Sequence, residues 1–343
     1  MLRVLYIGNK LFSHRRVKTV METLEPLLSE FCILRTTSDK RNQFLRFIDM
    51  NYQFFRFGLM ADKIIIDVYS TLAFNYALYF GILSKLFSIN FILFLHGGGL
   101  PNKYEKSTKT ISFLLKNAFR TIAPSNYLAN YFKLKGYSVT VIPNIIDTKL
   151  YHFIERKEVR PTLLSLRGLD EIYNPFMTIK AVQQLKSKIP NIRLLILSNE
   201  SESLYKEVLS FITLNNLSDN IVVQPKVPKS EWIRLNADYD IMISNPYIDN
   251  TPVSILEGMA LGMCVLTTNV GGIPYLVNEK ECGQVQSNDY VGLANKIMEV
   301  LESPGYANQL SLNGRLKSLE FDWTNVNKLW KEILFDEFEK KHT

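Results

Sequence analysis

Short apolar runs rich in β-branched residues alternate along the chain with longer segments of helical pattern. Parallel strands need a crossover between them, usually a helix, so this alternation predicts parallel sheets covered on both faces. The first half contains predicted strands at Arg3–Gly8, Phe31–Arg35, Lys63–Val68, Asn90–Leu95, Thr121–Ala123 and Thr140–Ile142. The second half begins the pattern again, with predicted strands at Thr162–Leu166, Arg193–Ser198, Ile221–Gln224, Asp240–Ser244, Cys264–Thr268 and Gly283–Val285. The expected fold class is α/β, with two Rossmann-like, doubly wound parallel-sheet domains facing across a cleft.

Helical patterns separate these strands. They lie at Arg16–Leu28, Phe74–Phe87, Thr108–Ala118 and Asn126–Lys135, and then at Phe176–Ile189, Leu204–Asn215, Ser230–Asn236, Val253–Leu261 and Asp289–Leu301. The charged stretch Ile154–Pro161 is the expected linker, which gives domains at 1–155 and 156–322. The amphipathic segment Trp323–Phe338 is expected to form a helix, so that 323–343 packs back on the first domain.

Composition excludes several classes of protein. A chain of 343 residues that is 47% apolar can bury two ordinary cores. Three scattered cysteines, Cys32, Cys264 and Cys282, fit a reducing compartment and neither a disulfide framework nor a zinc site. The uncharged stretch Val68–Ser84 is too polar for a membrane span and is expected as a buried helix, so the expected location is cytoplasmic.

The net charge of +7 is unevenly placed. Residues 102–136 contain seven lysines and arginines against one acid, Glu105. Such a segment suits an anionic membrane or a phosphorylated substrate, and it equally fits an ordinary solvated surface. The chain has no stacking or groove-reading motif, so nucleic acid is not an expected partner.

The stretch DNTPVSILEGMALGMCVLTTNVGGIPYL, from Asp249 to Leu276, holds the densest group of candidate site residues. The preceding strand ends near Ser244, and ligands of open α/β sheets bind at the carboxyl ends of strands. Thr251 is a good helix N-cap, and Pro252 suits the first helical position. The next backbone N–H groups, those of Val253, Ser254 and Ile255, would then face outward at the positive end of the helix and suit a phosphate.

Two acids flank this predicted helix start. Glu257 lies about one and a half turns into the helix, where its carboxylate can accept two hydrogen bonds from a ribose diol. Asp249 precedes the cap and can reach sugar hydroxyls of the same ligand. Gly262 is placed to end the helix in the left-handed conformation, and Gly271-Gly272 allows close backbone approach. Each feature alone also fits a capped helix with turn glycines, and it is their order in one stretch that favours a nucleotide-sugar site.

Taken together, DNTPVSILEGMALG and VLTTNVGGIPYLV resemble the donor-binding signature of retaining glycosyltransferases of the GT-B type, family 4 (glycosyl transferases group 1). The segment Ile122–Ile146, with Asp147 after it, is similar to the end of that family's first domain. The segment Leu163–Gly168 is similar to the first strand and arginine of its donor domain. The resemblance extends over essentially the whole chain.

The resemblance implies roles for particular residues. Glu257 would bind the nucleotide ribose, Asp249 the donor sugar, and the helix start at Val253–Ile255 the diphosphate. The other expected donor-binding residues are Gly8, Tyr173, Asn174 and Thr251. Arg167 would stabilise the departing diphosphate, where negative charge develops. His96, in the strand-end sequence LHGGGLP with Gly97 and Gly98, would lie near the transferred sugar.

The chain departs from the family pattern at three places. The first acid is Asp249, where the longer glutamate is common. Tyr173 stands where a lysine is usual, six residues after Arg167, and it is followed by Asn174; a tyrosine cannot supply the missing charge. The loop after the first strand usually has paired glycines, but here Gly8 is followed by His14, Arg15 and Arg16. Arg15 and Arg16 are candidates for charge compensation or for binding a phosphorylated acceptor. The expected acceptor or phosphate contacts are His14, Arg15, Arg16, Gly97 and Gly98.

The leading hypothesis is therefore a retaining, metal-independent enzyme that transfers a hexosyl unit from a nucleotide diphosphate sugar to a glycan or a lipid-carrier-linked acceptor. The nucleotide sugar is a co-substrate, and no cofactor is expected. An acceptor on a lipid carrier would place the protein at the inner face of the membrane. Two alternatives stay open, which are a nucleotide-sugar epimerase or hydrolase and a non-catalytic nucleotide-sugar binder. Asp238-Tyr239-Asp240 has the form of a metal-binding motif, but it stands at the entrance of a buried strand and is expected to be structural.

Overall fold

The computed structural model describes residues 1–10 and 19–336, and these residues form two compact units. Unit 1 contains residues 1–145 together with the chain from Thr324 onward, and unit 2 is Ile146–Trp323. Each unit holds one six-stranded sheet whose strand pairs are all parallel. The predicted α/β class with two doubly wound parallel sheets is confirmed.

The sheet of unit 1 has the strand order β2-β1-β3-β4-β5-β6. The strands are β1 (Arg3–Ile7), β2 (Ile33–Thr37), β3 (Lys63–Val68), β4 (Phe91–Leu95), β5 (Arg120–Ala123) and β6 (Thr140–Val141). The helices are α1 (Val20–Leu28), α2 (Gln43–Phe57), α3 (Phe74–Leu86), α4 (Leu100–Lys106), α5 (Thr108–Asn117), α6 (Asn126–Leu134) and α14 (Trp323–Phe335). A short 3-10 turn, η2 (Gly58–Met60), follows α2 directly.

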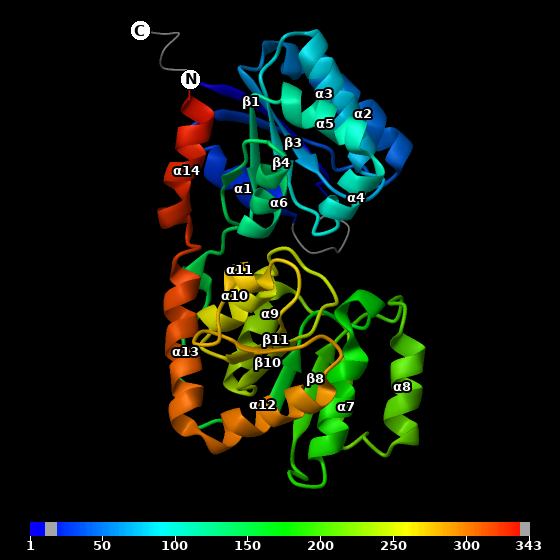
Figure 1. Cartoon of the computed structure of the whole chain (residues 1–343), viewed down its shortest axis with the longest axis vertical. Helices are drawn as coiled ribbons and strands as arrows, with labels where there is room; N and C mark the ends of the chain where they lie inside the picture. Colours follow the sequence, from blue (N-terminus) through cyan, green and yellow to red (C-terminus); the bar gives the residue numbers. More distant parts are fainter. Residues whose placement is uncertain (11–18, 337–343) are drawn as a thin grey trace. The chain divides into compact units, whose positions relative to one another are not determined.

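Alternate strand residues of unit 1 point to opposite faces of the sheet. Leu5, Ile64 and Phe91 belong to the face packed against α2, α3 and α5. The opposite face carries Phe94, whose ring makes an edge contact with Trp330 of α14 at a centroid distance of 5.4 Å. Figure 1 shows α2, α3 and α5 on one side of the sheet and α14 on the other. Both faces are covered, so the strands β1, β3 and β4 are buried along nearly their whole length and mostly apolar, which is why their positions could be read from the sequence.

The sheet of unit 2 has the strand order β12-β11-β10-β7-β8-β9. The strands are β7 (Thr162–Ser165), β8 (Arg193–Leu197), β9 (Ile221–Gln224), β10 (Ile241–Ser244), β11 (Cys264–Thr268) and β12 (Gly283–Val285). The helices are α7 (Pro175–Leu185), α8 (Tyr205–Leu214), α9 (Lys229–Trp232), α10 (Val253–Ala260), α11 (Ile273–Leu276), α12 (Tyr290–Glu302) and α13 (Pro304–Leu319). One core joins the sheet to α7, α8 and α12, and a second joins its other face to α10 and α11.

Four helices were not predicted from the sequence, namely α2, α4, α11 and α13. Helix α13 packs through small or polar residues such as Ala307, Ser311 and Gly314, so its buried face lacks an apolar period. Helix α2 is apolar on its outer as well as its inner face, which blurs the same signal. Predicted strand ends were otherwise displaced by one or two residues, as at β2, because hydrogen bonding and not composition sets where pairing stops.

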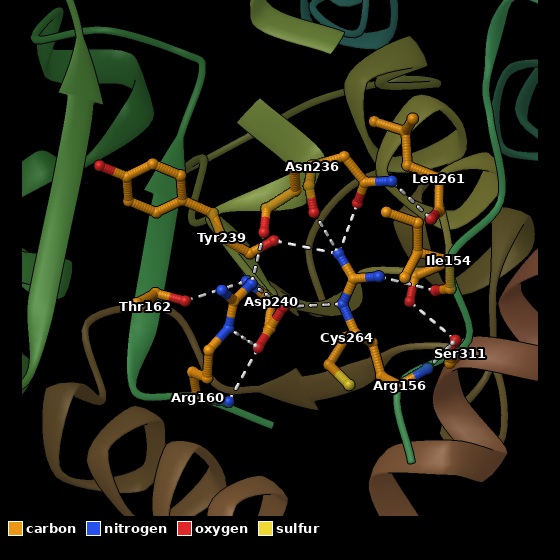
Figure 2. Close-up of polar contacts among 12 residues, drawn as sticks. Ile154, Arg156, Arg160, Thr162, Asn236, Tyr239, Asp240, Leu261, Cys264 and Ser311 are labelled. Atoms are coloured by element: carbon orange, nitrogen blue, oxygen red, sulfur yellow. Dashed lines mark hydrogen bonds and ion pairs between the residues drawn. The ribbon is translucent and has the colours of Figure 1, made fainter. Parts of the chain in front are cut away.

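The charged stretch Ile154–Pro161, expected as a linker, lies inside unit 2. Its Arg156 is buried and donates to the carbonyl oxygens of Ile154 (2.7 Å) and Asn236 (2.6 Å), as Figure 2 shows. The same guanidinium forms an ion pair with Asp240, with 2.9 Å between Nε and Oδ1. The stretch expected as a linker is therefore anchored in unit 2 by Arg156, whose charge is neutralised by an acid 84 residues further on, while Glu155, Lys157, Glu158 and Arg160 are exposed.

Asp240 also accepts hydrogen bonds from Arg160, at 2.8 Å from its Nε and at 2.8 Å from its backbone N–H. Burial raises the pKa of this carboxyl, but the hydrogen bonds from Arg160 and the charge of Arg156 outweigh it, so the pKa is lowered overall. Asp240 is thus fully engaged in structure, and Asp238-Tyr239-Asp240 forms the entrance to β10. No metal-binding group of three or more histidine, cysteine, aspartate or glutamate side chains occurs within 1–10 and 19–336.

Candidate active site

The strand ends of unit 1 bring His96 next to a buried carboxylate that was not singled out in the sequence. His96 follows β4 directly, and its Nε2 lies 2.7 Å from Oδ1 of Asp67 at the end of β3. The hydroxyl of Tyr6 donates to the same oxygen at 2.8 Å. The side chains of His96 and Asp67 are only 6% and 1% exposed. Asp67 therefore orients the imidazole, and a lone acid inside the apolar run IIIDV was the signal that could have found it.

Two tyrosines complete this cluster. The ring of Tyr69 stacks on the imidazole of His96 at a centroid distance of 5.0 Å. Burial, and then the charge of Asp67, raise the pKa of Tyr6 and of Tyr69 well above the ordinary phenol value. Both hydroxyls therefore stay protonated at neutral pH and can donate to the carboxylate. The imidazole is held in one orientation by a hydrogen bond and by stacking.

Glycines make room for this arrangement. A Cβ atom on Gly8 would lie 2.4 Å from Oδ2 of Asp67, so a larger residue at position 8 would displace the carboxylate. A Cβ atom on Gly97 would lie 2.9 Å from the backbone nitrogen of Ser70. Gly98 lies in the turn that leads to α4. His14, Arg15 and Arg16 lie outside the described residues, so their predicted roles in acceptor or phosphate binding stay predictions.

In unit 2, Arg167 and Asp249 meet at the carboxyl ends of the neighbouring strands β7 and β10. One terminal nitrogen of Arg167 donates to Oδ2 of Asp249 at 2.7 Å. The guanidinium carbon lies 4.3 Å from the ring centroid of Tyr173, within the range of a cation–π contact. Tyr173 thus supports Arg167 from one face, a role that was not expected when it was interpreted as the replacement of a lysine.

Asn174 follows with a left-handed backbone (φ +47°) and begins α7. Its side-chain amide donates to Oδ1 of Asn288 at 3.0 Å, which joins the end of β7 to the start of α12. It also lines a cavity of about 620 Å³ bordered by residues of α7 and α8. Among the predicted donor-binding residues within the described part of unit 2, Asn174 alone lines this cavity. The contact of the Asn174 side chain with Asn288 therefore gives this residue a structural role next to Tyr173.

The loop that carries Asp249 is shaped by the paired glycines. Gly271 has φ +55°, and a Cβ atom on it would lie 2.2 Å from the carbonyl oxygen of Asp249. A Cβ atom on Gly272 would lie 1.9 Å from the carbonyl oxygen of Asn250, and its N–H donates to the carbonyl oxygen of Asp249 at 2.8 Å. The close approach expected of this pair is to the backbone of the neighbouring loop. The glycines hold the carboxylate of Asp249 in place.

Asp249 itself is partly withdrawn from water, with its side chain 17% exposed. Burial raises the pKa of its carboxyl, and the positive charge of Arg167 and the backbone N–H of Asn250 only partly oppose this rise. The pKa of Asp249 is therefore shifted in the opposite direction from that of Asp240.

Helix α10 begins at Val253, the first residue of its predicted range, but its cap differs from the prediction. Pro252 occupies the cap position and Val253 is the first helical residue, so the prediction of Thr251 as N-cap and Pro252 as first residue was wrong. The N–H of Ile255 bonds to the carbonyl oxygen of Pro252 at 3.1 Å, which leaves the start of the helix to Val253 and Ser254. The hydroxyl of Ser254 is buried and has no hydrogen-bond partner among the residues that the structure describes. An orphaned hydroxyl beside the positive end of a helix suits an anionic ligand.

Glu257 is held by two residues that the sequence did not single out. Oε1 accepts a hydrogen bond from the hydroxyl of Tyr151 at 2.9 Å and lies 2.5 Å from Nζ of Lys229 at the start of α9. Burial, and then the charge of Glu257, raise the pKa of the Tyr151 hydroxyl. The ring of Tyr151 also lies beneath the Lys229 ammonium, 5.2 Å from it. The carboxylate is thus fixed in one orientation by Tyr151 and Lys229. Gly262 ends the helix with φ +80°, as predicted.

Comparison with known proteins assigns this arrangement to a family. Residues 147–317 match the family model of glycosyl transferases group 1. A curated relative, one of the subunits of phosphatidylinositol N-acetylglucosaminyltransferase from Arabidopsis thaliana, is 22% identical over 210 residues. That match covers 59% of this chain and 45% of the relative, so the chain spans less than half of its length.

Solved structures show the same fold. Sucrose-phosphate synthase from Thermosynechococcus elongatus is similar with a TM-score of 0.78 at 16% identity, over 97% of this chain and 99% of that one. HepE from Anabaena, in complex with UDP, has a TM-score of 0.77 at 16% identity with the same coverage. A glycosyltransferase from Rickettsia africae has a TM-score of 0.72 at 16% identity and covers 98% of both chains.

The two parallel-sheet units and these neighbours define a protein of the GT-B fold. The chain belongs, through its second unit, to the glycosyl transferases group 1 family. The predictions of the fold, of the family and of a glycosyltransferase enzyme are confirmed. No helix within 1–10 and 19–336 is long and apolar enough to cross a membrane.

Proposed function

We propose that the chain transfers a hexosyl unit from a nucleotide diphosphate sugar, with retention of configuration, to a glycan or lipid-linked acceptor. The observation that carries this proposal is the Arg167–Asp249 pair at the carboxyl ends of β7 and β10. It joins a cation suited to a diphosphate and an acid suited to sugar hydroxyls within 2.7 Å, beside the start of α10. The HepE neighbour was solved with UDP-glucose, which supports a nucleotide-sugar donor for the same fold.

The donor's nucleotide end is proposed to bind at Glu257. A ribose diol offers two hydroxyl donors, and the two oxygens of a carboxylate fixed in place can accept both. Binding of the diol to Oε1 would compete with Lys229, whose Nζ now contacts that oxygen. Displaced from Glu257, the ammonium of Lys229 would keep a positive charge at this end of the site. That charge is one replacement for the lysine that is missing at position 173.

The diphosphate is proposed to face the N–H groups of Val253 and Ser254 and the hydroxyl of Ser254. In the transfer step, the bond from the sugar C1 to the phosphate oxygen breaks, and its electron pair leaves on the diphosphate. The acceptor oxygen forms the new bond to C1 from the same face, and its proton passes to the departing phosphate oxygen. Arg167 and the helix start stabilise the departing charge, so we propose that the step needs no metal ion. His96 is proposed to act on the transferred sugar.

Two features support a lipid-linked acceptor. The segment 102–136 has seven basic residues against one acid, and an acceptor on a phosphate-containing lipid carrier would be anionic. The curated relative in Arabidopsis is named for transfer to phosphatidylinositol, a lipid. A soluble glycan is the other proposed acceptor class.

The proposal is tested by incubating the protein with UDP-, GDP-, ADP-, CMP- and dTDP-sugars and following the release of free nucleotide. We expect slow release of nucleotide from one of these donors, and we expect Glu257→Ala to abolish that release. Glu200→Ala, at an exposed acid of the same unit, is the control and should release nucleotide like the wild type. Release that survives Glu257→Ala would overturn the assignment of this site.

Arg167 is held by Asp249 and by the ring of Tyr173 in this structure, so a non-catalytic nucleotide-sugar binder is the second candidate function. It predicts that one nucleotide binds without release under any acceptor. Rapid release without an acceptor, or conversion of the donor to its epimer, would instead indicate a hydrolase or an epimerase.

A further inference from the structure

Helix α2 carries an apolar stripe on its outer surface. Phe44, Ile48, Tyr52, Phe55 and Leu59 follow one another at spacings of three and four residues, so they lie along one side of the helix and of the η2 turn after it. Phe44 is 70% exposed, and the other four are 44–52% exposed. We call these five residues the α2 stripe.

The α2 stripe is separate from the face of α2 that serves the core. Met50 and Phe54 are buried against the sheet side, and Phe54 packs on Phe80 of α3 at a centroid distance of 5.7 Å. A helix on a protein surface normally has polar residues opposite its buried face. Helix α2 has aromatic and aliphatic residues there, which its packing in unit 1 does not require.

The apolar surface continues onto α3, which lies beside α2 in Figure 1. Phe55 makes an edge contact with Phe87 at a centroid distance of 6.1 Å, and Phe87 is itself 43% exposed. Leu86, the last residue of α3, is 72% exposed. The α2 stripe and these two residues form one contiguous apolar face, and such a face marks an interaction site.

The charges around this face are mainly positive. Residues 40–60 and 71–90 contain five basic residues, Lys40, Arg41, Arg46, Arg56 and Lys85, and one acid, Asp49. Arg46 is buried and donates to backbone carbonyl oxygens, while Asp49 accepts a hydrogen bond from the hydroxyl of Ser38. Lys40 forms an ion pair with the exposed Asp39, with 3.2 Å between Nζ and Oδ1. The exposed basic residues that add positive charge beside this face are therefore Arg41, Arg56 and Lys85.

We propose that α2 and α3 dock unit 1 onto an anionic lipid bilayer. Phe44, Ile48, Tyr52 and Phe55 enter the boundary between headgroups and acyl chains, while Arg41, Arg56 and Lys85 contact anionic headgroups. Amphipathic helices that lie in a membrane interface combine these two features, aromatic and aliphatic residues on one face and arginines or lysines beside them. This face is distinct from the basic segment 102–136, and its binding needs neither donor nor acceptor.

The test measures co-sedimentation of the full chain with vesicles of phosphatidylcholine containing about 30% phosphatidylserine, and with vesicles of phosphatidylcholine alone. We expect the wild type to bind the anionic vesicles and to bind neutral vesicles at least about 10-fold less. The variant Phe44→Ser/Ile48→Ser/Tyr52→Ser should bind the anionic vesicles at least about 10-fold less than the wild type. The matched control, Leu209→Ser/Leu214→Ser/Leu316→Ser, removes exposed apolar residues of unit 2 and should bind like the wild type.

A second variant, Arg41→Glu/Arg56→Glu, leaves the apolar residues in place and should lose the preference for anionic vesicles. Nucleotide release from the donor should be unchanged in all three variants, so a failure of docking is distinguishable from a failure of the proposed function. The proposal is overturned if the wild type ignores anionic vesicles, or if the α2 variant binds as tightly as the control. It is also overturned if the wild type self-associates through this face without vesicles and the α2 variant is monomeric, since the face would then bind a second copy of the chain.

Discussion

The two ends of strand β10 each carry an aspartate that faces arginine, and they differ in how completely the charge is matched. Asp240, before the strand, is 4% exposed and meets both Arg156 and Arg160. Asp249, after the strand, is 17% exposed and meets Arg167. The pKa of Asp240 is lowered by its arginine partners in spite of burial, whereas burial raises the pKa of Asp249 in spite of Arg167.

This difference separates a structural ion pair from a site prepared for a ligand. At Asp240 the arginines supply more positive charge than the acid needs, and both also bind backbone carbonyls. At the other end, the buried Nε of Arg167 and the hydroxyl of Ser254 have no hydrogen-bond partner within the described residues. Polar groups fixed in place but left unmatched lower stability, and functional sites are where such a cost is found.

The largest effect on stability is expected from a substitution of Asp240, just before β10. Asp240→Asn leaves the buried guanidinium of Arg156 without its counter-charge, which should lower the free energy of unfolding by about 3–5 kcal/mol. Asp249→Asn should change it by no more than about 1 kcal/mol, because an amide resembles the protonated acid that burial already favours. Urea unfolding followed by circular dichroism compares the two variants. Equal losses of stability would show that the two ends of β10 do not differ in this way.

A smaller effect, on the rate of donor turnover and not on folding, is expected from a substitution of Arg167, which contacts Asp249 after β10. Arg167→Ala should slow donor turnover by about 10²–10³-fold, because it removes one positioned donor to the departing diphosphate. Arg193→Ala, at an exposed arginine of the same unit, is the matched control and should leave turnover unchanged. Single-turnover release of nucleotide measures both. An Arg167→Ala enzyme with wild-type turnover would show that Arg167 only supports Asp249.

Glu257 extends the comparison to a third acid. Glu257→Gln keeps the size of the side chain but removes the charge that holds Lys229, and an amide accepts with one oxygen only. We expect the affinity for the free nucleotide to fall about 10-fold, or ~1.4 kcal/mol, by isothermal titration calorimetry. The same substitution at Glu200 should have no effect. An unchanged affinity in Glu257→Gln would place the ribose elsewhere.

The smallest effect concerns pH, and its sign differs between the two aspartates. A lowered pKa means that the stability contributed by Asp240 is present above the ordinary carboxyl pKa of about 4 and is lost as pH falls through the folded-state value. A raised pKa means that the contribution of Asp249 is complete below about pH 4 and is lost as pH rises through the folded-state value. On acidification, the stability difference between wild type and Asp240→Asn should shrink. For Asp249→Asn the wild type should instead gain relative stability. Parallel pH profiles for the two variants would contradict the opposite pKa shifts.

Much of the fold was readable from the sequence because it depends on local pattern. Strands β3, β9, β11 and β12 lie at the predicted residues. The first three are runs rich in apolar or β-branched residues, whereas β12 is the short segment Gly-Gln-Val. Helix α2 was missed because its outer stripe makes it apolar on two sides. The cap of α10 was misplaced by one residue, since Thr251 and Pro252 are both good helix starts and only the backbone angles decide between them.

The sequence by itself determined the two parallel sheets, the strand-end loops and the pair of acids Asp249 and Glu257 around a helix start. Only the tertiary structure decided which groups these acids and the histidine meet: Arg167 on Asp249, Lys229 and Tyr151 on Glu257, and Asp67 under His96. The physical reason is the distance along the sequence over which each kind of interaction acts. Helix and strand propensities act over a few residues, whereas these contacts join residues 28 to 106 positions apart, and the order of strands in each sheet is what brings them together.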